Sequence, residues 1–340
     1  MKAAIFRGTG RFEVIDTHVP AIAPGQALLQ LRRVGICGTD LLIFRGGMPH
    51  RAKPGRILGH EMVGIIAIPA ADGRFGPGDR VVVEPTLSCH TCDACKRGLT
   101  HVCENLRFLG IDANGALQEF WAVPGGRLHR VPDSISDDHA AMVEPLAVAV
   151  HATRVAQISV KESVVVLGAG TIGSLIGLLA QRAGGRVVLL ETNRARREFA
   201  TTLGLDTCDP TGNVVERVNH WAGGAGADVV IEASGSADAA LIMTRLAAVH
   251  GRLIVVGIQS QQTAVDLFQV FFRELSLTGI RAYTRADFEM ALQLIASGAI
   301  DLSPLISHRF SLAAVQEAFE LAVSGAGVRK MLIDFTLGKT

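Results

Sequence analysis

The sequence predicts an α/β protein of two domains, in which a mainly β domain is followed by a doubly wound parallel sheet. The length of 340 residues exceeds the roughly 250 to 300 residues at which a single hydrophobic core stops growing, which favours two cores. Up to about residue 131, short runs of Val, Ile and Leu are separated by Gly and Pro turns. From about residue 143, strands alternate with helices, which is typical of a parallel sheet covered by helices.

The individual elements follow from these patterns. In the first region a strand is expected at residues 1–7, and further strands at 27–34, 62–68 and 80–84. In the second region the expected strands are 164–167, 187–191, 229–233 and 253–257, and the expected helices are 171–183, 195–203 and 237–249. Two amphipathic helices, 287–296 and 312–321, and a last strand, 330–335, end the chain.

One apolar run, residues 164–180, approaches the length of a membrane span. It contains glycines at positions 168, 170, 173 and 177, and it fits a strand, a tight turn and a helix better than a spanning segment. The N-terminal residues lack the long apolar stretch of a signal peptide. We therefore expect a cytoplasmic protein with no membrane segment.

Composition narrows the possible functions. With 49% hydrophobic and 19% charged residues, the chain is typical of a globular α/β protein rather than a disordered one. The 33 basic and 32 acidic residues leave a net charge of +1, so no overall charge attracts nucleic acid or a membrane, and a small-molecule partner is expected. Four of the six cysteines lie within 15 residues, which favours metal binding over a disulfide framework.

Those four cysteines form one motif. Cys89, Cys92, Cys95 and Cys103 follow the spacing C-x2-C-x2-C-x7-C, which allows four thiolates to surround one tetrahedral zinc ion. Four thiolates leave no position for water or substrate, so this zinc is expected to be structural and to hold a loop. A nucleic-acid zinc ribbon would need a basic and aromatic surface, and acidic residues are mixed with the basic ones here.

A second candidate metal site combines Cys37 with His60 and Glu61. Cys37 lies in Gly-Ile-Cys-Gly-Thr-Asp, and Gly-His-Glu follows with its histidine 23 residues later. Cysteine, histidine and carboxylate are the ligands of a catalytic zinc that keeps one position open. The residues alone leave a structural explanation open, since a lone cysteine usually belongs to the core and a lone histidine is usually a hydrogen-bonded polar group.

A dinucleotide site is predicted in the second region. The strand 164–167 runs directly into a G-x-G-x-x-G motif that opens a helix. These glycines permit a tight turn and a close approach of the pyrophosphate, which the amides at the helix N-terminus would bind. The motif residues assigned to the cofactor are Gly168, Gly170, Ile172 and Gly173.

The next strand favours NAD over NADP. It ends at Glu191, whose carboxylate is placed to accept hydrogen bonds from the adenosine ribose and to repel a 2′-phosphate. Arg194, Arg196 and Arg197 follow, and a basic cluster there is either a 2′-phosphate site or a solvated helix face. We expect NAD because the acidic side chain is the more specific part of the pattern.

The Cys-Gly-Thr-Asp motif, the Gly-His-Glu motif and the four-cysteine loop together resemble the medium-chain alcohol dehydrogenase family, and the likeness covers nearly the whole chain. The resemblance implies a GroES-like catalytic domain at residues 1–143, completed by about 288–340, and an NAD-binding Rossmann domain at 144–287. It also implies that Cys37 and His60 bind the catalytic zinc, with Glu61 as third ligand or as an exchangeable partner of water. Glu144 stands where polyol and threonine dehydrogenases carry a glutamate, and Asp40 is expected to orient His60.

The same resemblance assigns further roles. Thr39 would receive the substrate proton, although Leu42 replaces the histidine that often passes it on, so the proton must leave by another path. Phe44 and Phe108 are either pocket residues or ordinary core. The family is commonly dimeric or tetrameric, so a homo-oligomer is expected. The residues implied to lie near the cofactor are Arg196 at the adenosine, and Val256, Gly257, Ile258, Ile280 and Arg281 at the nicotinamide.

The sequence therefore predicts a zinc-dependent enzyme with two zinc ions that transfers hydride from a secondary alcohol of a polyol or sugar acid to NAD. One alternative is a threonine-type amino-alcohol dehydrogenase. A second is a regulatory protein that binds a nucleotide without turnover. A zinc-free quinone or enoyl reductase on the same fold would lack Cys37, His60 and the cysteine loop.

Overall fold

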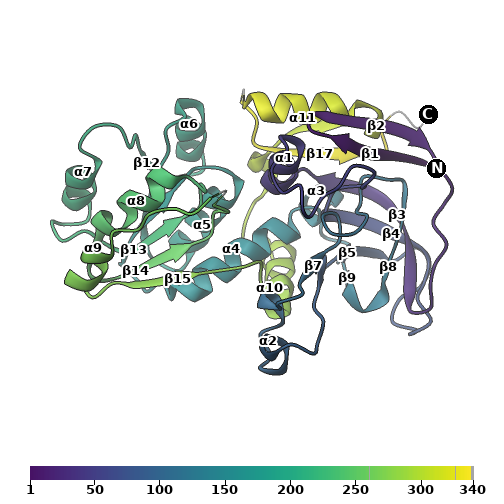
Figure 1. Ribbon diagram of the computed structural model, residues 1–340, viewed down its shortest axis with the longest axis horizontal. Coiled ribbons are helices and arrows are strands. Elements are labelled where there is room, and N and C mark those ends of the chain that lie inside the picture. Colours follow the sequence, from purple (N-terminus) through teal and green to yellow (C-terminus); the bar gives the residue numbers. More distant parts are fainter. Residues whose placement is uncertain (260, 326, 338–340) are drawn as a thin grey trace. The chain divides into compact units, whose positions relative to one another are not determined.

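The computed structural model describes residues 1–259, 261–325 and 327–337, and the chain divides into two compact units (Figure 1). Unit 1 comprises Met1–Pro145 and Thr284–Thr340, and unit 2 comprises Leu146–Tyr283. The sequence places these divisions after residues 143 and 287. Each unit has its own hydrophobic core.

Unit 1 is built on a seven-stranded sheet. Its strand order is β16-β17-β3-β4-β5-β9, and β8 also pairs with β3. The antiparallel pairing of β17 with β3 joins the end of the chain to the first domain, with Ile333 opposite Val34. The strands of this sheet are β3 (Gln26–Gly35), β4 (Glu61–Ile68), β5 (Arg80–Val83), β8 (Phe120–Pro124), β9 (Leu128–Arg130), β16 (Ile306–Phe310) and β17 (Lys330–Asp334).

Shorter elements surround this sheet. Two antiparallel two-stranded sheets pair β1 (Lys2–Gly8) with β2 (Arg11–Asp16) and β6 (Thr86–Leu87) with β7 (Arg107–Phe108). The helices are α1 (Gly38–Phe44), α2 (Asp93–Lys96), α3 (Asp137–Ala140), α10 (Arg285–Ala296) and α11 (Val315–Ser324). Single 3-10 turns occur at Thr100–Val102, Gly125–Arg127, Ser303–Leu305 and Leu312–Ala314.

Unit 2 is a doubly wound parallel sheet. The strand order is β12-β11-β10-β13-β14-β15, so the chain leaves β10 in one direction and returns to its other side through β13. All pairs are parallel, and right-handed crossovers then place helices on both faces. The strands are β10 (Ser163–Leu167), β11 (Arg186–Leu190), β12 (Asp206–Cys208), β13 (Ala227–Glu232), β14 (Ala247–Val255) and β15 (Ser276–Gly279).

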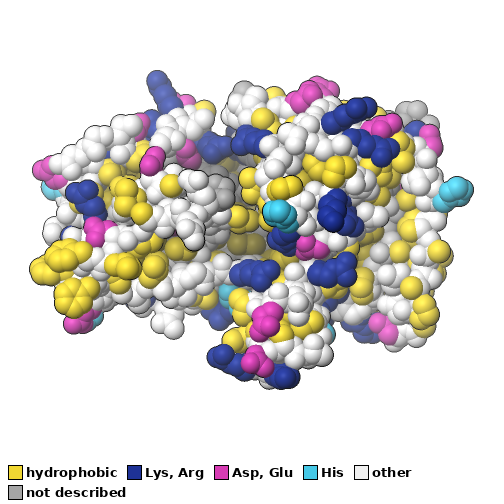
Figure 2. Space-filling view, viewed as in Figure 1, with side chains coloured by type: hydrophobic (Ala, Val, Ile, Leu, Met, Phe, Trp, Pro, Cys, Tyr) yellow, Lys and Arg dark blue, Asp and Glu magenta, His cyan; other side chains and the backbone are white. Residues whose placement is uncertain are grey.

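Six helices accompany these strands, and the first of them runs through the division between the units. They are α4 (Val143–Ala156), α5 (Thr171–Arg182), α6 (Arg194–Thr202), α7 (Val214–Trp221), α8 (Ala237–Leu246) and α9 (Leu267–Phe272). The short helix α9 exposes four large hydrophobic residues, Leu267, Phe268, Phe271 and Phe272. Figure 2 shows hydrophobic side chains at the surface where Figure 1 labels α9.

The elements differ from expectation at a few places. The expected helix 237–249 ends at Leu246, because Ala247 is already extended and opens β14. Alanine and valine fit either state, so pairing with β13 decides this boundary. The expected helix 312–321 begins with a 3-10 turn and continues as α11. The hydrophobic pattern of the sequence did not reveal α7 or α9.

The long apolar run forms β10, a glycine turn and most of α5, as the sequence predicts. Within the described ranges, the structure contains no helix of the length and apolarity needed to cross a membrane.

Candidate metal centres and dinucleotide site

The first metal centre begins where β3 ends and α1 starts. Cys37 is the N-cap of α1, and its thiol accepts a hydrogen bond from Thr39 N at 3.4 Å. Asp40 returns the interaction, since its Oδ2 accepts from Cys37 N at 2.9 Å. This capping box satisfies amide groups that a helix start would leave unpaired, and it fixes the position of the Cys37 thiol.

His60 and Glu61 reach the same point from the start of β4. The register of β3 and β4 places Gly35 opposite Glu61, and a Cβ at Gly35 would lie 2.3 Å from Glu61 Oε2. Glycine is therefore required for the carboxylate to approach the end of β3. The sulfur of Cys37, a ring nitrogen of His60 and a carboxylate oxygen of Glu61 all lie within 4.8 Å of one another.

These three donors fit a zinc ion. Thiolate, imidazole and carboxylate are zinc ligands, and three of them leave a coordination position open for another molecule. His60 Nδ1 lies 3.6 Å from Asp40 Oδ1, and both atoms are buried without a hydrogen bond to any described residue. Burial alone would lower the pKa of His60, but the Asp40 carboxylate and the Cys37 thiol raise it well above its usual value. A cation among these groups would compensate the buried negative charge.

Lys330 is a further member of this centre that the sequence did not reveal. Its Nζ pairs with Glu61 Oε2 and donates a hydrogen bond to Ile36 O at 3.1 Å, and its side chain is buried. Burial disfavours the ammonium group, but the charges of Glu61, Cys37 and Glu144 outweigh it and raise the pKa of Lys330. The signal in the sequence is a lysine at the start of a strand that is otherwise apolar up to Asp334.

The other residues implied by resemblance lie in different places. Glu144 is buried in the first turn of α4 and acts on the charge of Lys330, but it lies outside the group of three converging ligands. Thr39 is half-buried in the first turn of α1. Phe44 is core, stacked on Phe12 at 5.7 Å. Phe108 instead lies edge-on to His60, with ring centroids 6.5 Å apart.

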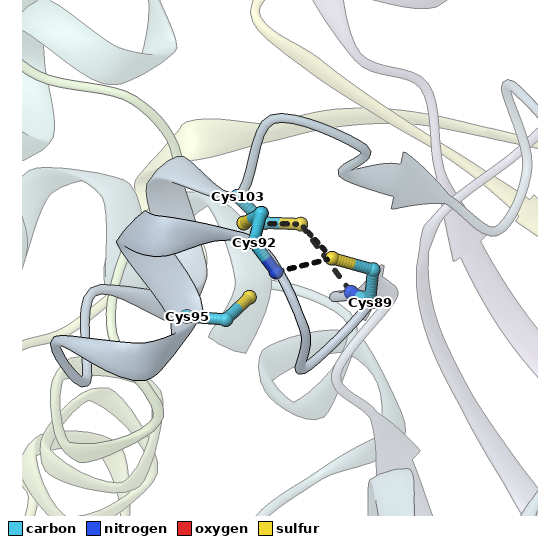
Figure 3. Close-up of side chains that lie close together, drawn as sticks. All are labelled: Cys89, Cys92, Cys95 and Cys103. Carbon is cyan, nitrogen blue, oxygen red and sulfur yellow. Dashed lines mark hydrogen bonds between the residues drawn. The ribbon is translucent and has the colours of Figure 1, made fainter.

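The second metal centre gathers the four cysteines around α2 (Figure 3). The sulfur of Cys103 lies 3.4 Å from that of Cys89 and 3.8 Å from that of Cys92. Four sulfurs at the usual zinc–sulfur distance of about 2.3 Å would be separated by about 3.8 Å at the edges of a tetrahedron. Hydrogen bonds from Thr91 and from Cys92 N lower the pKa of Cys89 to about 5. The arrangement therefore fits a closed tetrahedral zinc site.

The glycine motif has the geometry of a dinucleotide site within unit 2. Gly168 has a φ of +102°, which favours glycine, and it turns the chain from β10 toward α5. A Cβ at Gly173 would lie 1.9 Å from Gly168 O, so only glycine allows this packing of helix against turn. A Cβ at Gly170 would meet no atom within 4 Å, so packing does not require glycine at this position. Ile172 is half-buried in the first turn of α5.

Glu191 follows β11 and supports the same turn. Its Oε2 accepts a hydrogen bond from Ala169 N at 2.9 Å, and its Oε1 accepts from Asn193 N at 2.8 Å. Arg196 Nη1 lies 3.9 Å from Glu191 Oε2. Arg197 Nη1 donates to Glu191 O at 2.6 Å. The carboxylate thus lies beside the glycine turn, with Arg196 directed toward it.

The residues expected near the nicotinamide lie at the carboxyl ends of the next strands. Val256 N and Gly257 N both donate to Glu232 O, at 2.8 and 3.0 Å, and Ile280 N donates to Val255 O at 3.0 Å. Ile258 and Arg281 are exposed. In a parallel sheet all these strand ends share one edge, which is where such folds bind nucleotides.

Glu232, at the end of β13, is a residue that the sequence reasoning missed. Its side chain is fully buried, and its Oε1 accepts from Ser234 N, Ser234 Oγ and Gly235 N, while Oε2 accepts from Gln259 Nε2. The carboxylate therefore fixes the loops that follow β13 and β14. Its signal is a carboxylate that ends an apolar strand immediately before Ala-Ser-Gly.

Comparison with known proteins gives consistent results along the chain. Residues 23–133 match the family described as alcohol dehydrogenase GroES-like domain, and residues 171–297 match zinc-binding dehydrogenase. The chain is 42% identical over 321 residues, 94% of each protein, to 2-dehydro-3-deoxy-L-galactonate 5-dehydrogenase of Pseudoalteromonas atlantica. It is 33% identical over 306 residues, 89% of each protein, to L-galactonate-5-dehydrogenase of Escherichia coli.

A similar solved structure, described only as a zinc-binding dehydrogenase, comes from Sinorhizobium meliloti and has NADP bound. It superposes with a TM-score of 0.91 at 32% sequence identity and covers 98% of both chains.

Proposed function

The chain belongs to the zinc-containing medium-chain alcohol dehydrogenase family, and from that premise we propose that it oxidises a secondary hydroxyl of a sugar acid or polyol and transfers the hydride to NAD. The observation that carries the proposal is the convergence of Cys37, His60 and Glu61 within 4.8 Å. The names of the relatives with 42% and 33% identity favour a sugar acid oxidised at carbon 5.

In this mechanism Cys37, His60 and Glu61 hold the catalytic zinc. When bound, zinc acts as a Lewis acid on the substrate hydroxyl. Asp40 keeps the imidazole of His60 oriented, and Lys330 neutralises Glu61. The hydroxyl of Thr39 takes the substrate proton, and because Leu42 cannot pass it on, the proton leaves by a path that does not use residue 42. Glu144, whose charge helps to raise the pKa of Lys330, is the carboxylate that the family resemblance offers as an additional ligand.

A second zinc is proposed at Cys89, Cys92, Cys95 and Cys103. The sulfur separations of 3.4 and 3.8 Å support it, as does the absence of an open position when four thiolates bind. Its role is to hold the loop between β6 and β7.

The proposed cofactor is NAD. Support comes from Glu191, a carboxylate fixed beside the glycine turn where it would repel a 2′-phosphate. Arg196 is the residue that would favour NADP, which the Sinorhizobium protein binds, but here it faces Glu191 at 3.9 Å. A carboxylate so close to the arginine opposes binding of another anion.

We further propose a homo-oligomer that acts in the cytosol. β15 is the edge strand of the sheet in unit 2, and all four of its residues are exposed. The helix before it exposes Phe271 by 78% and Phe272 by 70%, a surface better suited to a second copy than to water. None of the six cysteines, all of which the structure describes, forms a disulfide, which fits a reducing compartment. Sedimentation of the zinc-loaded protein would give the number of subunits.

The test is a panel of sugar acids, polyols and amino alcohols assayed with NAD and with NADP by nicotinamide absorbance. We expect NAD-dependent oxidation of a sugar acid or polyol. The variant Cys37→Ser should lose turnover and keep NAD binding, while Cys208→Ser, at a cysteine outside both metal centres, should keep both. Preference for threonine would indicate the amino-alcohol alternative. Cofactor binding without turnover of any alcohol would indicate a regulatory protein.

A further inference from the structure

A basic pocket of about 450 Å³ opens in unit 1. Its lining includes His50, Arg51, Lys53, Arg56, Arg107 and Asp112. Figure 2 shows several Lys and Arg side chains, with an acidic side chain among them, around the region where Figure 1 labels β7. None of these residues is used by the mechanism above.

The pocket and the metal centre share one aromatic ring. Phe108 lies edge-on to His60 at 6.5 Å between ring centroids. The guanidinium of Arg51 lies over the same ring, 5.9 Å from its centroid. The ring of Phe108 therefore lies next to both His60 and Arg51, a residue of the pocket lining.

The pocket has an excess of positive charge. Arg51 and Asp112 neutralise each other through two hydrogen bonds, of 2.9 Å from Nε and 2.6 Å from Nη2. Burial raises the pKa of Asp112, but the hydrogen bonds and charge of Arg51 outweigh burial and lower it. This carboxylate therefore stays ionised and paired. Arg107 also acts on the charge of Asp112, which leaves Lys53 and Arg56 without an acidic partner in the lining and gives the pocket a net positive charge. An anion is the ligand that this charge distribution fits.

Among the residues that line the pocket, Arg56 has a side-chain donor that could bind an anion. Its backbone is fixed, because Phe6 N donates to Arg56 O at 2.8 Å and Arg56 N donates to Lys53 O at 3.2 Å. Its Nε is buried and makes no hydrogen bond to any residue that the structure describes. A buried guanidinium donor without an acceptor is unfavourable, and a bound oxyanion would satisfy it.

We propose that Lys53, Arg56 and Arg107 bind the terminal carboxylate of a sugar-acid substrate while its reacting hydroxyl lies at Cys37, His60 and Glu61. This assignment rests on the proposed function, and it makes the basic pocket the feature that selects acids over neutral polyols. In a six-carbon acid oxidised at carbon 5, the carboxylate is at the far end of the carbon chain, which matches two sites on either side of Phe108. The phosphate group of a sugar phosphate is also a terminal oxyanion and could bind in the same pocket. The experiment must therefore distinguish a carboxylate from a phosphate ester.

The test compares L-galactonate with galactitol and galactitol 1-phosphate, using the zinc-loaded enzyme and NAD. The variant Lys53→Gln/Arg56→Gln should lower kcat/KM for L-galactonate by about tenfold or more, mainly through KM, and should change kcat/KM for galactitol by less than about twofold. Added salt should reduce the preference of the wild type for the acid. The control Lys2→Gln/Arg11→Gln removes the same two charges from the β1–β2 hairpin and should change neither substrate.

An equal effect of the variant on acid and polyol, or no effect, would overturn the proposal. A wild-type preference for the phosphate ester that the variant abolishes would overturn the carboxylate assignment. Titration calorimetry with L-galactonate separates this proposal from the proposed function, because it needs no turnover. Binding that the variant weakens supports the pocket even if no alcohol is oxidised, and a wild type that binds no L-galactonate overturns it.

Discussion

Lys330 Nζ lies against Glu61 Oε2, and both side chains are buried next to Cys37. The two residues are 269 positions apart in the chain. They meet because β17 and β4 both pair with β3, so the last strand delivers an ammonium group to the carboxylate that begins β4. The third candidate zinc ligand is thus held by a residue from the far end of the sequence.

Removing the ammonium group should destabilise unit 1. We expect Lys330→Met to lower the free energy of unfolding of the metal-free protein by about 3 to 5 kcal/mol, because Glu61 would be left as a buried charge without a partner. The double variant Lys330→Met/Glu61→Gln should recover most of that loss. Denaturant unfolding measures both values, and a double variant as unstable as Lys330→Met alone would show that the pair is not coupled.

Disrupting the four-cysteine loop should remove one zinc ion and leave the other. Cys95→Ser leaves three thiolates for a site that fits four, so its zinc should dissociate in the presence of a chelator. Metal analysis should then find half the zinc of the wild type, and the melting temperature should fall. Cys208→Ser is the matched control and should retain all the zinc. Full zinc content in Cys95→Ser would contradict the structural assignment.

The hydroxyl of Thr39 should matter for catalysis and not for folding. Thr39→Val keeps the shape of the side chain and removes the proton acceptor, and we expect kcat to fall by about 10² to 10⁴. Thr39→Ser restores a hydroxyl and should retain most of the activity. Steady-state kinetics and thermal melting distinguish the two effects. Activity of Thr39→Val near that of the wild type would assign the proton transfer elsewhere.

The charge of Glu191 should set the cofactor preference. Glu191→Gln keeps the size of the side chain and one acceptor for Ala169 N, but it removes the charge that repels a 2′-phosphate and frees Arg196. We expect the ratio of kcat/KM for NADP to that for NAD to rise by about tenfold. Glu320→Gln, on α11 of unit 1, is the control. An unchanged ratio would show that another residue discriminates between the cofactors.

Glu84 should make the protein sensitive to acid. Burial raises its pKa, but the hydrogen bond with His129 and the charge of Arg127 outweigh burial and lower it. A lowered pKa in the folded state means that the stabilisation is complete above the unfolded value of about 4.3 and is lost as pH falls through the folded value.

Melting temperatures measured between neutral pH and that acidic window test this. Glu84→Gln should lower stability at neutral pH by about 1 to 3 kcal/mol, because hydrogen bonds to a charged group are lost, and should flatten the decline in acid. The exposed Glu13, replaced by Gln, should leave the decline unchanged. If Glu84→Gln showed the same pH dependence of the melting temperature as the wild type, the acid sensitivity would come from other carboxylates.

The sequence by itself determined the features that depend on short spacing. Four cysteines within 15 residues can reach one ion whatever the rest of the chain does, and the glycine turn between β10 and α5 needs only its own backbone geometry. The alternation of strands and helices likewise predicted the parallel sheet of unit 2, because its periodicity is local.

Only the tertiary structure decided which distant residues meet. Phe44 and Phe108 had equal claims in the sequence, and packing made the first part of the core and placed the second against His60. Lys330 carries no local signal of its pairing with Glu61, and Arg56 none of its buried and unpaired Nε. Strand register sets these contacts, and register depends on pairings between residues far apart in the chain, which no local spacing encodes.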